Sequence, residues 1–387
     1  MLDEGSPAEA DAVRSIYVHA PFCARRCVYC DFAVEVRREG DATGWLSAVA
    51  GELAHVAAEG SFPLAERLDT LYVGGGTPSL LGPDAMAGLA AVLDPRRVSE
   101  PEMEWTAEAN PESFTTGIAE AWRRAGVNRL SLGAQSFHGP ALEWMGRLHG
   151  PEGVGAAVHV AREAGFDNIS VDLMFGLPGH LGRSWALDLE RALELEPRHV
   201  SLYGLTVEAA TPLGRAVRQG REKPVDDELY REEYLQAAEV LTSAGYRHYE
   251  VSNFARPGGD SRHNSVYWSG DPYLGLGNAA HSYAEPLRRW NHRDWESYSA
   301  AIVRGESPEA GRETIDDDAR RLENVWLSLR TDRGLPLADL PSRTSAMVER
   351  WLGAHLAAMN GDRLRLTAEG WLVLDRLTVD LDECLAG

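Results

Sequence analysis

Apolar stretches with two different spacings alternate along the first half of this chain. Short runs of β-branched and aromatic residues, of which RSIYVHA at 14–20 is the first, have the pattern of buried strands. Longer stretches such as GWLSAVAGELAHVAAE at 44–59 carry apolar residues three and four positions apart, which is the pattern of amphipathic helices. Regular alternation of strands and helices is typical of a parallel sheet with helical crossovers.

About six strand–helix units are expected in roughly the first 200 residues. The strands are expected at 14–20, 67–76, 103–111, 128–136, 167–179 and 199–206, and the helices at 44–59, 82–94, 114–126, 151–165 and 185–197. Because such crossovers are right-handed, the series forms a full or partial barrel or an open doubly wound sheet. The cysteine run, GGGTP, EANP, GAQS and DLMFGLP all lie at strand C-terminal ends. This placement favours an α/β barrel, whose C-terminal rim carries binding and catalysis.

The pattern changes after residue 250. Residues 252–295 are rich in Gly, Asn, His, Trp and Tyr and are expected to form loops with short strands. A helix is expected at 316–330, and 337–377 predicts helices, a turn at Asn360–Gly361, a strand and a last helix. Helices followed by a hairpin are a winged-helix pattern, but no basic recognition face accompanies it, so DNA binding is not expected.

These patterns divide the chain into four parts. The expected division is a leader at 1–13, a barrel domain at 14–250, a linking segment at 251–310 and a winged-helix-like α+β domain at 311–387.

Composition and charge place the chain among ordinary globular proteins. Of its 387 residues, 44% are hydrophobic and 25% are charged. The formal net charge of −21 disfavours nucleic acid and anionic membranes as general partners. No apolar run approaches the roughly 18 residues of a membrane span, and the acidic N-terminus lacks the pattern of a signal peptide. We therefore expect a cytoplasmic protein.

Three of the four cysteines lie close together in PFCARRCVYCDF. In a cytoplasmic chain, such clustered thiols more often bind metal or carry out redox chemistry than form disulfides. Cys23, Cys27 and Cys30 have the spacing C-x3-C-x2-C, and three thiolates hold three irons of a four-iron cubane while the fourth iron stays open to a small molecule. A zinc site completed by His19 and a thioredoxin-like pair of Cys27 and Cys30 are the alternatives. The isolated Cys384 is expected to be an inert thiol.

The cysteine run also carries a family resemblance. With SIYVHAPFC before it and an aromatic residue, Tyr29, before the last cysteine, it resembles the radical S-adenosylmethionine (SAM) enzymes. Within them it is similar to the branch of oxygen-independent coproporphyrinogen III oxidase and its relatives. Several motifs match in order from Tyr17 to the C-terminal domain. The resemblance implies a partial (β/α)6 barrel followed by a winged-helix-like domain.

The same resemblance implies the cofactors and their chemistry. Cys23, Cys27 and Cys30 would ligate a [4Fe-4S] cluster whose open iron chelates the amino and carboxylate groups of SAM. An electron from the reduced cluster then breaks a carbon–sulfur bond of SAM, and a 5′-deoxyadenosyl radical forms. The residues implied to contact SAM are Tyr17, Tyr29, Gly75, Gly76, Thr77, Glu108, Gln135, Arg147 and Asp172. Glycines allow close approach of a backbone to a ligand, and a glutamate has the charge to hold a ribose hydroxyl or an ammonium group.

Two departures from the oxidase bear on function. Phe32 stands where the oxidase has a further cysteine. Since Tyr17 is already close to the start, we also expect the longer N-terminal extension of the oxidase to be missing. Both departures disfavour oxidative decarboxylation of coproporphyrinogen III. They match instead the HemW-type heme chaperones, relatives that bind heme and deliver it to acceptor proteins.

One further motif supports this branch. RHNSVYW at 262–268 matches the H-N-x-x-Y-W signature of the heme-chaperone group. His263 is the first candidate for an axial heme ligand, with Tyr267 and Trp268 packing on the porphyrin, and His281 is the second. Arg262 and Arg288 are candidates for contacts with the heme propionates.

We therefore expect a heme chaperone that carries a [4Fe-4S] cluster and SAM. Coproporphyrinogen III oxidase, an enzyme of porphyrin metabolism, is the alternative, and a radical methyltransferase on the same scaffold is a third interpretation. The expected partners are heme, an electron donor for the cluster and heme-acceptor proteins, some of which are membrane-associated. Nucleic acid is not an expected partner. The sequence leaves open the acceptor, the cleavage of SAM, the covalency of the heme and the formation of a homodimer.

Overall fold

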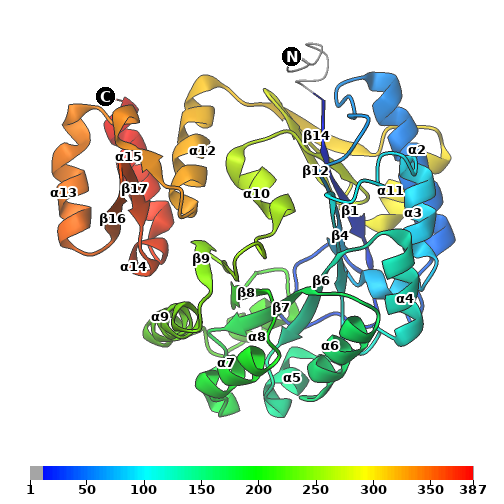
Figure 1. The fold of residues 1–387 in the computed structure, drawn as a ribbon, viewed down its shortest axis with the longest axis horizontal. Coiled ribbons are helices and arrows are strands. Elements are labelled where there is room, and N and C mark those ends of the chain that lie inside the picture. Colours follow the sequence, from blue (N-terminus) through cyan, green and yellow to red (C-terminus); the bar gives the residue numbers. More distant parts are fainter. Residues whose placement is uncertain (1–11, 387) are drawn as a thin grey trace.

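A large twisted sheet forms the centre of the molecule (Figure 1). The computed structural model describes residues 12–386, so most of the expected leader at 1–13 lies outside the described residues. Within them, the central sheet has nine strands in the order β11-β1-β4-β5-β6-β7-β8-β10-β9. These strands are β1 (Ser15–Ala20), β4 (Thr70–Gly75), β5 (Glu104–Ala109), β6 (Arg129–Gln135), β7 (Asn168–Phe175), β8 (His199–Gly204), β9 (Arg247–Glu250), β10 (Asn253–Ala255) and β11 (Leu274–Leu276).

The strand order confirms the expected partial barrel. β1 and β4 to β8 are parallel, and each pairs with the strand that precedes it in this series. The series therefore winds in one direction, without the reversal of strand order that defines a doubly wound sheet. β11 adds a parallel strand at one edge, and β10 and β9 add antiparallel strands at the other.

Helices cover the outer face of this sheet (Figure 1). They are α2 (Ala42–Glu59), α3 (Ala85–Leu93), α4 (Thr116–Ala125), α5 (Gly139–Met145), α6 (Gly153–Glu163), α7 (Trp185–Glu194), α8 (Pro212–Arg218) and α9 (Asp227–Ser243). The predicted strands and helices of this half are all present, with ends shifted by a few residues. Their apolar side chains pack between sheet and helices in a core that includes Trp45, Leu71, Trp105, Trp122 and Leu130, all fully buried.

The inner face of the barrel is polar. Alternate residues of a strand point to opposite faces, so the inward set can be read from each strand. β5 contributes Glu104, Thr106 and Glu108, and β6 contributes Arg129 and Ser131. Thr106, Arg129 and Ser131 are buried, and the Arg129 Nη1 donates to the Thr106 Oγ1 over 3.5 Å. The polar side chains inside the barrel bond to one another, which offsets the cost of their burial.

The segment after β10 corrects one expectation. RHNSVYWS forms a helix, α10 (Arg262–Ser269), where loops and short strands were expected. The Ser261 Oγ accepts from the backbone N of Asn264, and the buried Glu104 carboxylate accepts from the backbone N of Arg262 and of His263. A carboxylate at a helix N-terminus satisfies free N–H groups and favours the helix dipole. The expected linking segment 251–310 thus supplies β10, β11 and α10 to the barrel region.

Two short sheets flank the barrel strands. β2 (Phe22–Cys23) pairs with β3 (Glu35–Val36), so the cysteine run lies between two paired strands. A second small sheet has the order β12-β13-β14, and the helix α11, which lies between β13 and β14 in the sequence, packs against α2. Its elements are β12 (His281–Ala284), β13 (Leu287–Asn291), α11 (Trp295–Val303) and β14 (Glu309–Thr314).

The C-terminal domain lies at one end of the molecule, with α12 next to α10 (Figure 1). It is an α+β unit with a three-stranded sheet in the order β15-β17-β16. Its elements are α12 (Asp317–Arg330), β15 (Leu335–Pro336), α13 (Ser345–Gly353), β16 (Ala357–Asn360), β17 (Arg363–Leu366), α14 (Ala368–Trp371) and α15 (Leu374–Ala386). Its core is continuous with that of the second half of the barrel, since Leu329, Trp371 and Leu381 belong to the same buried cluster as Val200 and Ala237.

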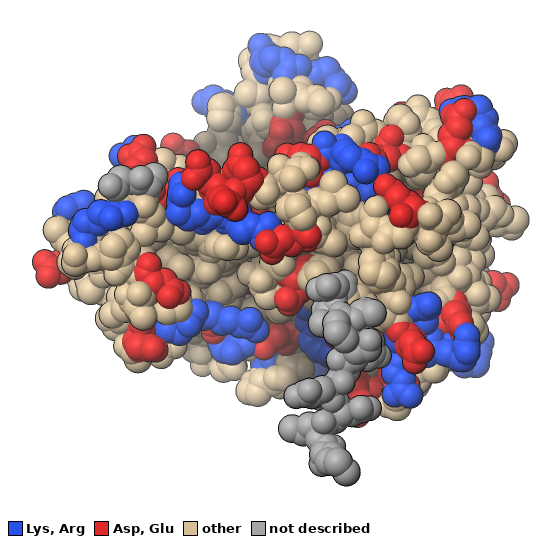
Figure 2. Space-filling model, turned by 90° about the horizontal axis from the view of Figure 1, so that it is seen from above, with Lys and Arg blue, Asp and Glu red and all other residues tan. Residues whose placement is uncertain are grey.

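The surface carries both signs of charge. On the face shown in Figure 2, acidic and basic side chains are interspersed, without a broad basic area. None of the described helices is both long enough and apolar enough to cross a membrane.

Candidate functional site

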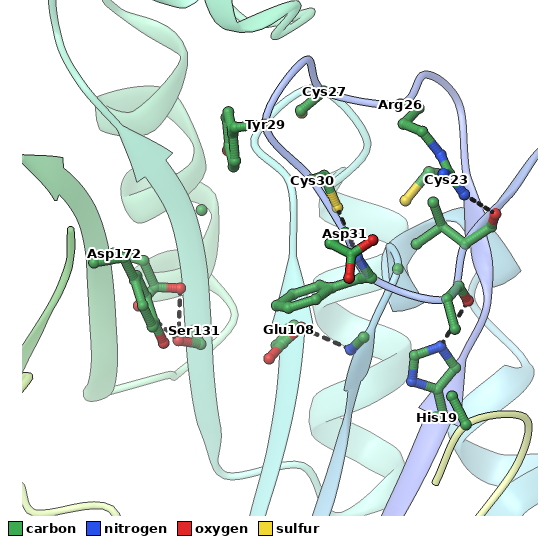
Figure 3. Close-up of a pocket in the computed structure, with 18 of the residues that line it drawn as sticks. His19, Cys23, Arg26, Cys27, Tyr29, Cys30, Asp31, Glu108, Ser131 and Asp172 are labelled. Atoms are coloured by element: carbon green, nitrogen blue, oxygen red, sulfur yellow. Dashed lines mark hydrogen bonds between the residues drawn. The ribbon is translucent and has the colours of Figure 1, made fainter. Parts of the chain in front are cut away.

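One large cavity opens at the C-terminal ends of the barrel strands. Its volume is about 910 Å³, and the three clustered cysteines lie on its wall. Figure 3 shows the cysteine loop on one side, Asp172 with Ser131 on the opposite side, and Glu108 between them. A cavity at this rim agrees with the position of functional sites in α/β barrels.

Each cysteine sulfur has a hydrogen-bond donor within reach. The Thr77 Oγ1 donates to the Cys23 Sγ over 3.4 Å, and the backbone N of Phe32 donates to the Cys30 Sγ over 3.4 Å. The Arg147 guanidinium lies 3.9 Å from the Cys27 Sγ. Burial raises the pKa of Cys23 to about 11 and also raises the pKa of Cys30. A bound metal lowers the pKa of a thiol because it stabilises the thiolate.

The three thiols line one cavity but do not converge on a single ion. Between residues 12 and 386, no three Cys, His, Asp or Glu side chains converge closely enough to hold one metal ion. A cubane places each thiolate on a different iron, so its ligands surround a volume instead of a point. His19, which would complete the alternative zinc site, is engaged in other contacts. The His19 Nε2 lies 3.0 Å from the carbonyl oxygen of Ala33, and its Nδ1 lies 3.0 Å from the Tyr17 hydroxyl.

The glycine turn after β4 is sterically constrained. Gly75 has φ +104°, a backbone conformation that side chains rarely adopt, and a Cβ there would lie 2.2 Å from the His19 ring. A Cβ on Gly76 would lie 2.6 Å from the carbonyl oxygen of Ala20. Both residues line the cavity, so glycine is required for this close approach of backbone and site.

Glu108 sits in the cavity as a partly buried carboxyl group with two donors. The Tyr72 hydroxyl donates to its Oε1 over 2.7 Å, and the backbone N of Gly75 donates to its Oε2 over 3.0 Å. Burial, together with repulsion from Asp172, raises the pKa of Glu108 to about 7, although these donors and Arg129 act in the opposite direction. The carboxyl group is therefore poised to ionise when a cationic ligand binds next to it.

Arg147 connects the cysteine loop with the ends of β5 and β6. Its Nη2 donates to the Asn110 Oδ1 over 2.6 Å and to the carbonyl oxygen of Gly133 over 2.7 Å, and its Nε is buried without a partner among the described residues. Gln135, next to it, has φ +67° in a strand irregularity. Strained, non-glycine backbone of this kind clusters at functional sites.

Asp172 forms the opposite wall of the cavity. The Ser131 Oγ lies 3.0 Å from each of its carboxylate oxygens, and the Ser170 Oγ lies 3.2 Å from one of them. Burial raises the pKa of Asp172, while these hydroxyls act against the shift. Asp172 and Glu108 thus place two partly buried carboxyl groups in one cavity, which suits a ligand with positive charge.

The structure brings together most of the residues that the sequence singled out. Those lining the cavity are Tyr17, Cys23, Cys27, Tyr29, Cys30, Gly75, Gly76, Glu108, Gln135, Arg147, Asp172 and His281. Thr77 lies behind the wall, where its hydroxyl meets Cys23 and the Asn110 amide. Asn110 was missed as a site residue, although EANP, whose third residue it is, had been recognised at a strand end.

His263 is not among the residues that line the cavity, and both of its ring nitrogens are hydrogen-bonded. Its Nδ1 is 2.7 Å from the Thr70 Oγ1, and its Nε2 is 2.8 Å from the Tyr267 hydroxyl. Burial lowers its pKa to about 3, so the ring is neutral. This arrangement leaves no ring nitrogen free for a heme iron. Its hydrogen bonds instead join α10 to β4.

His281 has a different environment. It is exposed to the cavity, and its ring stacks on Trp290 with centroids 5.9 Å apart. No described residue hydrogen-bonds to its ring nitrogens, and partial burial lowers its pKa, which favours the neutral form that binds metals. The two arginines expected at the propionates are not among the residues that line the cavity. Arg288 pairs with Glu313 and Glu323, and the Arg262 guanidinium donates to a backbone carbonyl, that of Glu102.

Comparison with known proteins identifies the family. Residues 17–192 match the model of the radical SAM superfamily. The heme chaperone HemW of Mycobacterium tuberculosis is 38% identical over 363 residues, covering 93% of this chain and 92% of that protein. The HemW of Bacillus subtilis is 34% identical, covering 84% of this chain and 85% of that protein. The chain belongs to the HemW family of radical SAM proteins.

A relative outside bacteria and one solved structure agree with this assignment. The mouse mitochondrial radical S-adenosyl methionine domain-containing protein 1 is 37% identical, with 97% of this chain and 89% of that protein covered. The structure of coproporphyrinogen III oxidase (HemN) from Escherichia coli superposes with a TM-score of 0.79 at 22% identity, covering 97% of this chain and 91% of that one. The latter likeness establishes the fold. Membership of the radical SAM superfamily implies binding of a [4Fe-4S] cluster and SAM. The three clustered cysteines of this HemW-family chain line one cavity.

Proposed function

We propose that this chain is a heme chaperone, which binds heme in the cavity that also holds its cluster and SAM and passes the heme to acceptor proteins. One observation carries the proposal beyond the family match. The cavity has the thiols on one wall and, on another, the His281 imidazole, whose ring nitrogens have no protein partner within residues 12–386. At about 910 Å³ it is near the upper end of ordinary ligand pockets, roughly 300–1,000 Å³, which supports two ligands instead of one.

The cysteine wall would hold the cluster. Cys23, Cys27 and Cys30 would each ligate one iron, and the fourth iron would take SAM. When bound, this pair of groups supplies one-electron chemistry at the sulfonium of SAM. Thr77 and Arg147 would stabilise the thiolates, because each aims a donor at a sulfur.

The floor and far wall would hold SAM. Gly75 and Gly76 would contact its methionine part through their backbone, and Glu108 and Asp172 would face its positive charges or ribose hydroxyls. The remaining proposed contacts are Tyr17, Tyr29, Gln135 and Arg147. The buried Nε of Arg147, which has no partner in the described part of the chain, is suited to an anionic group such as the SAM carboxylate.

Heme would occupy the part of the cavity next to the aromatic side chains. Phe32, Tyr203, Tyr267 and Tyr273 line it, and His281 is our candidate for the axial ligand. Phe32 is 62% exposed, so a porphyrin face could cover a phenyl ring that now faces solvent. His263 would reach a heme only after α10 gave up the bonds to Thr70 and Tyr267.

An anaerobic titration of heme into the cluster-reconstituted protein tests this proposal. We expect near-stoichiometric binding without turnover of coproporphyrinogen III in the same sample. The His281→Ala variant should shift the main heme absorption band and weaken binding at least about tenfold, since it removes a bond to iron. The His263→Ala variant should keep the band position but lower the unfolding free energy by roughly 2 kcal/mol, because it leaves buried groups unpaired.

The opposite outcomes separate the alternatives. Turnover without heme binding would identify an oxidase and contradict the interpretation of Phe32. A band shifted by His263→Ala and unchanged by His281→Ala would place the axial ligand on α10.

The affinity for SAM should depend on pH through Glu108. Below its pKa of about 7, the carboxyl group must release a proton before it can stabilise a cation, so we expect SAM binding to strengthen as pH rises from 5.5 to 7.5. The gain approaches about tenfold per pH unit well below the pKa and levels off above it. In the Glu108→Gln variant the profile should lose this contribution and keep only the shallower dependence from the SAM amino group, which must release its proton to bind iron. Calorimetric titration of both proteins measures this difference.

The exposed Glu143 provides the matched control. Its replacement, Glu143→Gln, removes one carboxyl group outside the cavity and should leave the profile unchanged. A profile in Glu108→Gln that is as steep as that of the wild type would show that Glu108 is not the titrating residue.

A further inference from the structure

The turn that precedes His281 has an unusually constrained backbone. Gly277 has φ +98°, and a Cβ there would lie 2.7 Å from the carbonyl oxygen of His19. Ala279 has φ +58°, a conformation uncommon for a residue with a side chain. Ala279, Ala280 and His281 all line the cavity. Such strain persists only where the surrounding structure fixes the backbone. Here the strained residues lie next to the proposed ligand site.

A buried carboxyl group fixes this turn from below. Glu52, on α2, accepts from the backbone N of Gly277 over 2.8 Å, from the Tyr298 hydroxyl over 2.6 Å and from the Asn291 amide over 2.6 Å. The Asn291 amide also donates to the carbonyl oxygen of Gly277 over 2.8 Å. The turn is therefore held rigidly on the side that faces away from the cavity.

Asn278 ties the same turn to the end of the cysteine run. Its side chain is 1% exposed, and its Nδ2 donates to the carbonyl oxygen of Ala33 over 3.1 Å and to that of Arg293 over 2.9 Å. Ala33 follows the last cluster cysteine, Cys30, by three residues. The same Ala33 oxygen accepts from the His19 Nε2. One amide thus joins the loop that carries the cysteines to the turn that presents His281.

A second contact reinforces this connection at the surface. The Arg293 guanidinium lies 3.1 Å from the Asp31 carboxylate and also donates to the Asp31 backbone oxygen. Since Asn278 bonds to the backbone of Arg293, residues 31–33 and the turn at 277–281 are joined at two points. A displacement of either segment must break one of these bonds or move the other segment.

We propose that Asn278 is a positioning residue that couples the cluster loop to the heme ligand His281, so that occupancy of the cluster site changes the affinity for heme. The inference rests on the proposed function. Assembly of the cluster fixes the three thiols, and the Ala33–Asn278 bond transmits that order to the turn. Coupling between two sites is reciprocal, so heme should change the affinity for SAM by the same factor.

The test compares heme affinity with and without the cluster in three full-length proteins. For the wild type, we expect hemin binding to differ by about tenfold between the cluster-free and the reconstituted form, within the usual range of such couplings. In Asn278→Asp, which keeps the shape but turns two donated bonds into repulsion, the ratio should fall to about one. Asn128→Asp is the matched control, because this partly buried amide bonds only to the backbone of residues 103 and 105 in the barrel wall. It should keep the wild-type ratio.

A second variant decides the matter if Asn278→Asp does not fold. Arg293→Gln changes a side chain that is 64% exposed and removes both guanidinium contacts with Asp31, the ion pair and the bond to its backbone oxygen. We expect it to lower the ratio at least twofold. Heme-dependent SAM affinity, measured by calorimetry, should change in parallel. A ratio of one in the wild type, or an unchanged ratio in both variants, would overturn the coupling while leaving the heme chaperone intact. Absence of heme binding by the wild type would overturn the proposed function itself.

Discussion

Replacing Cys27 by alanine is expected to abolish assembly of the [4Fe-4S] cluster. The cavity offers three thiols for four irons, so the loss of one leaves two irons without a protein ligand. Changes to residues that merely support a ligand cost about 10–100-fold in metal affinity, and the loss of the ligand itself should cost more. Iron and sulfide content and the visible absorption of anaerobically reconstituted protein measure this effect.

Cys384 provides the matched control within the same chain. It is a free, partly buried thiol on α15 and packs among apolar side chains of the C-terminal core. Cys384→Ala removes the same group and should retain full iron content. Stoichiometric iron in Cys27→Ala would contradict the assignment of the three cysteines as cluster ligands.

A Cβ on Gly75 is expected to abolish SAM binding and to destabilise the fold. The added methyl group would overlap the His19 ring at 2.2 Å, and the backbone at φ +104° disfavours any side chain. Overpacking of a filled site costs about 1–3 kcal/mol, and a positive φ adds about 1–2 kcal/mol. We therefore expect Gly75→Ala to lose roughly 3 kcal/mol of unfolding free energy. Chemical denaturation and SAM titration measure the two consequences.

The chain also offers a glycine at which the same change should be harmless. Gly117 lies within α4, and a Cβ there would meet no atom within 4 Å. Gly117→Ala should leave SAM binding unchanged and stabilise the protein by about 0.5–1 kcal/mol, because alanine favours the helix. Wild-type SAM affinity in Gly75→Ala would show that the turn has room that the structure does not indicate.

Much of the barrel could be predicted because its signals are local. The strand runs are separated from amphipathic helices, and the strands that carry chemistry end in glycine, proline or cysteine motifs. The inward positions can also be read from the sequence: Glu104, Thr106 and Glu108 alternate with apolar residues in one strand. Local periodicity determines which residues face one side of a strand, so it also predicts that these side chains share the interior.

The helix α10 could not be predicted in the same way. Asn, His, Trp and Tyr have modest helix propensity, and RHNSVYWS gives little helical signal. Its N-terminus is held by the carboxylate of Glu104, which is about 160 residues away in the sequence. The hydrogen bonds of His263 could not be predicted either, because its partner Thr70 lies 193 residues away in the sequence. The motif alone therefore favours His263 as a heme ligand.

The sequence by itself therefore determined the family, the barrel and most of the residues around its rim. It also predicted the three cysteines as cluster ligands. Each of these follows from short-range spacing, which the chain carries whatever its neighbours are. Only the tertiary structure decided which histidine faces the cavity and which amide joins the cluster loop to the turn before His281. The reason is physical: the state of an imidazole or an amide depends on burial and on hydrogen-bond partners, and those partners come from distant parts of the chain.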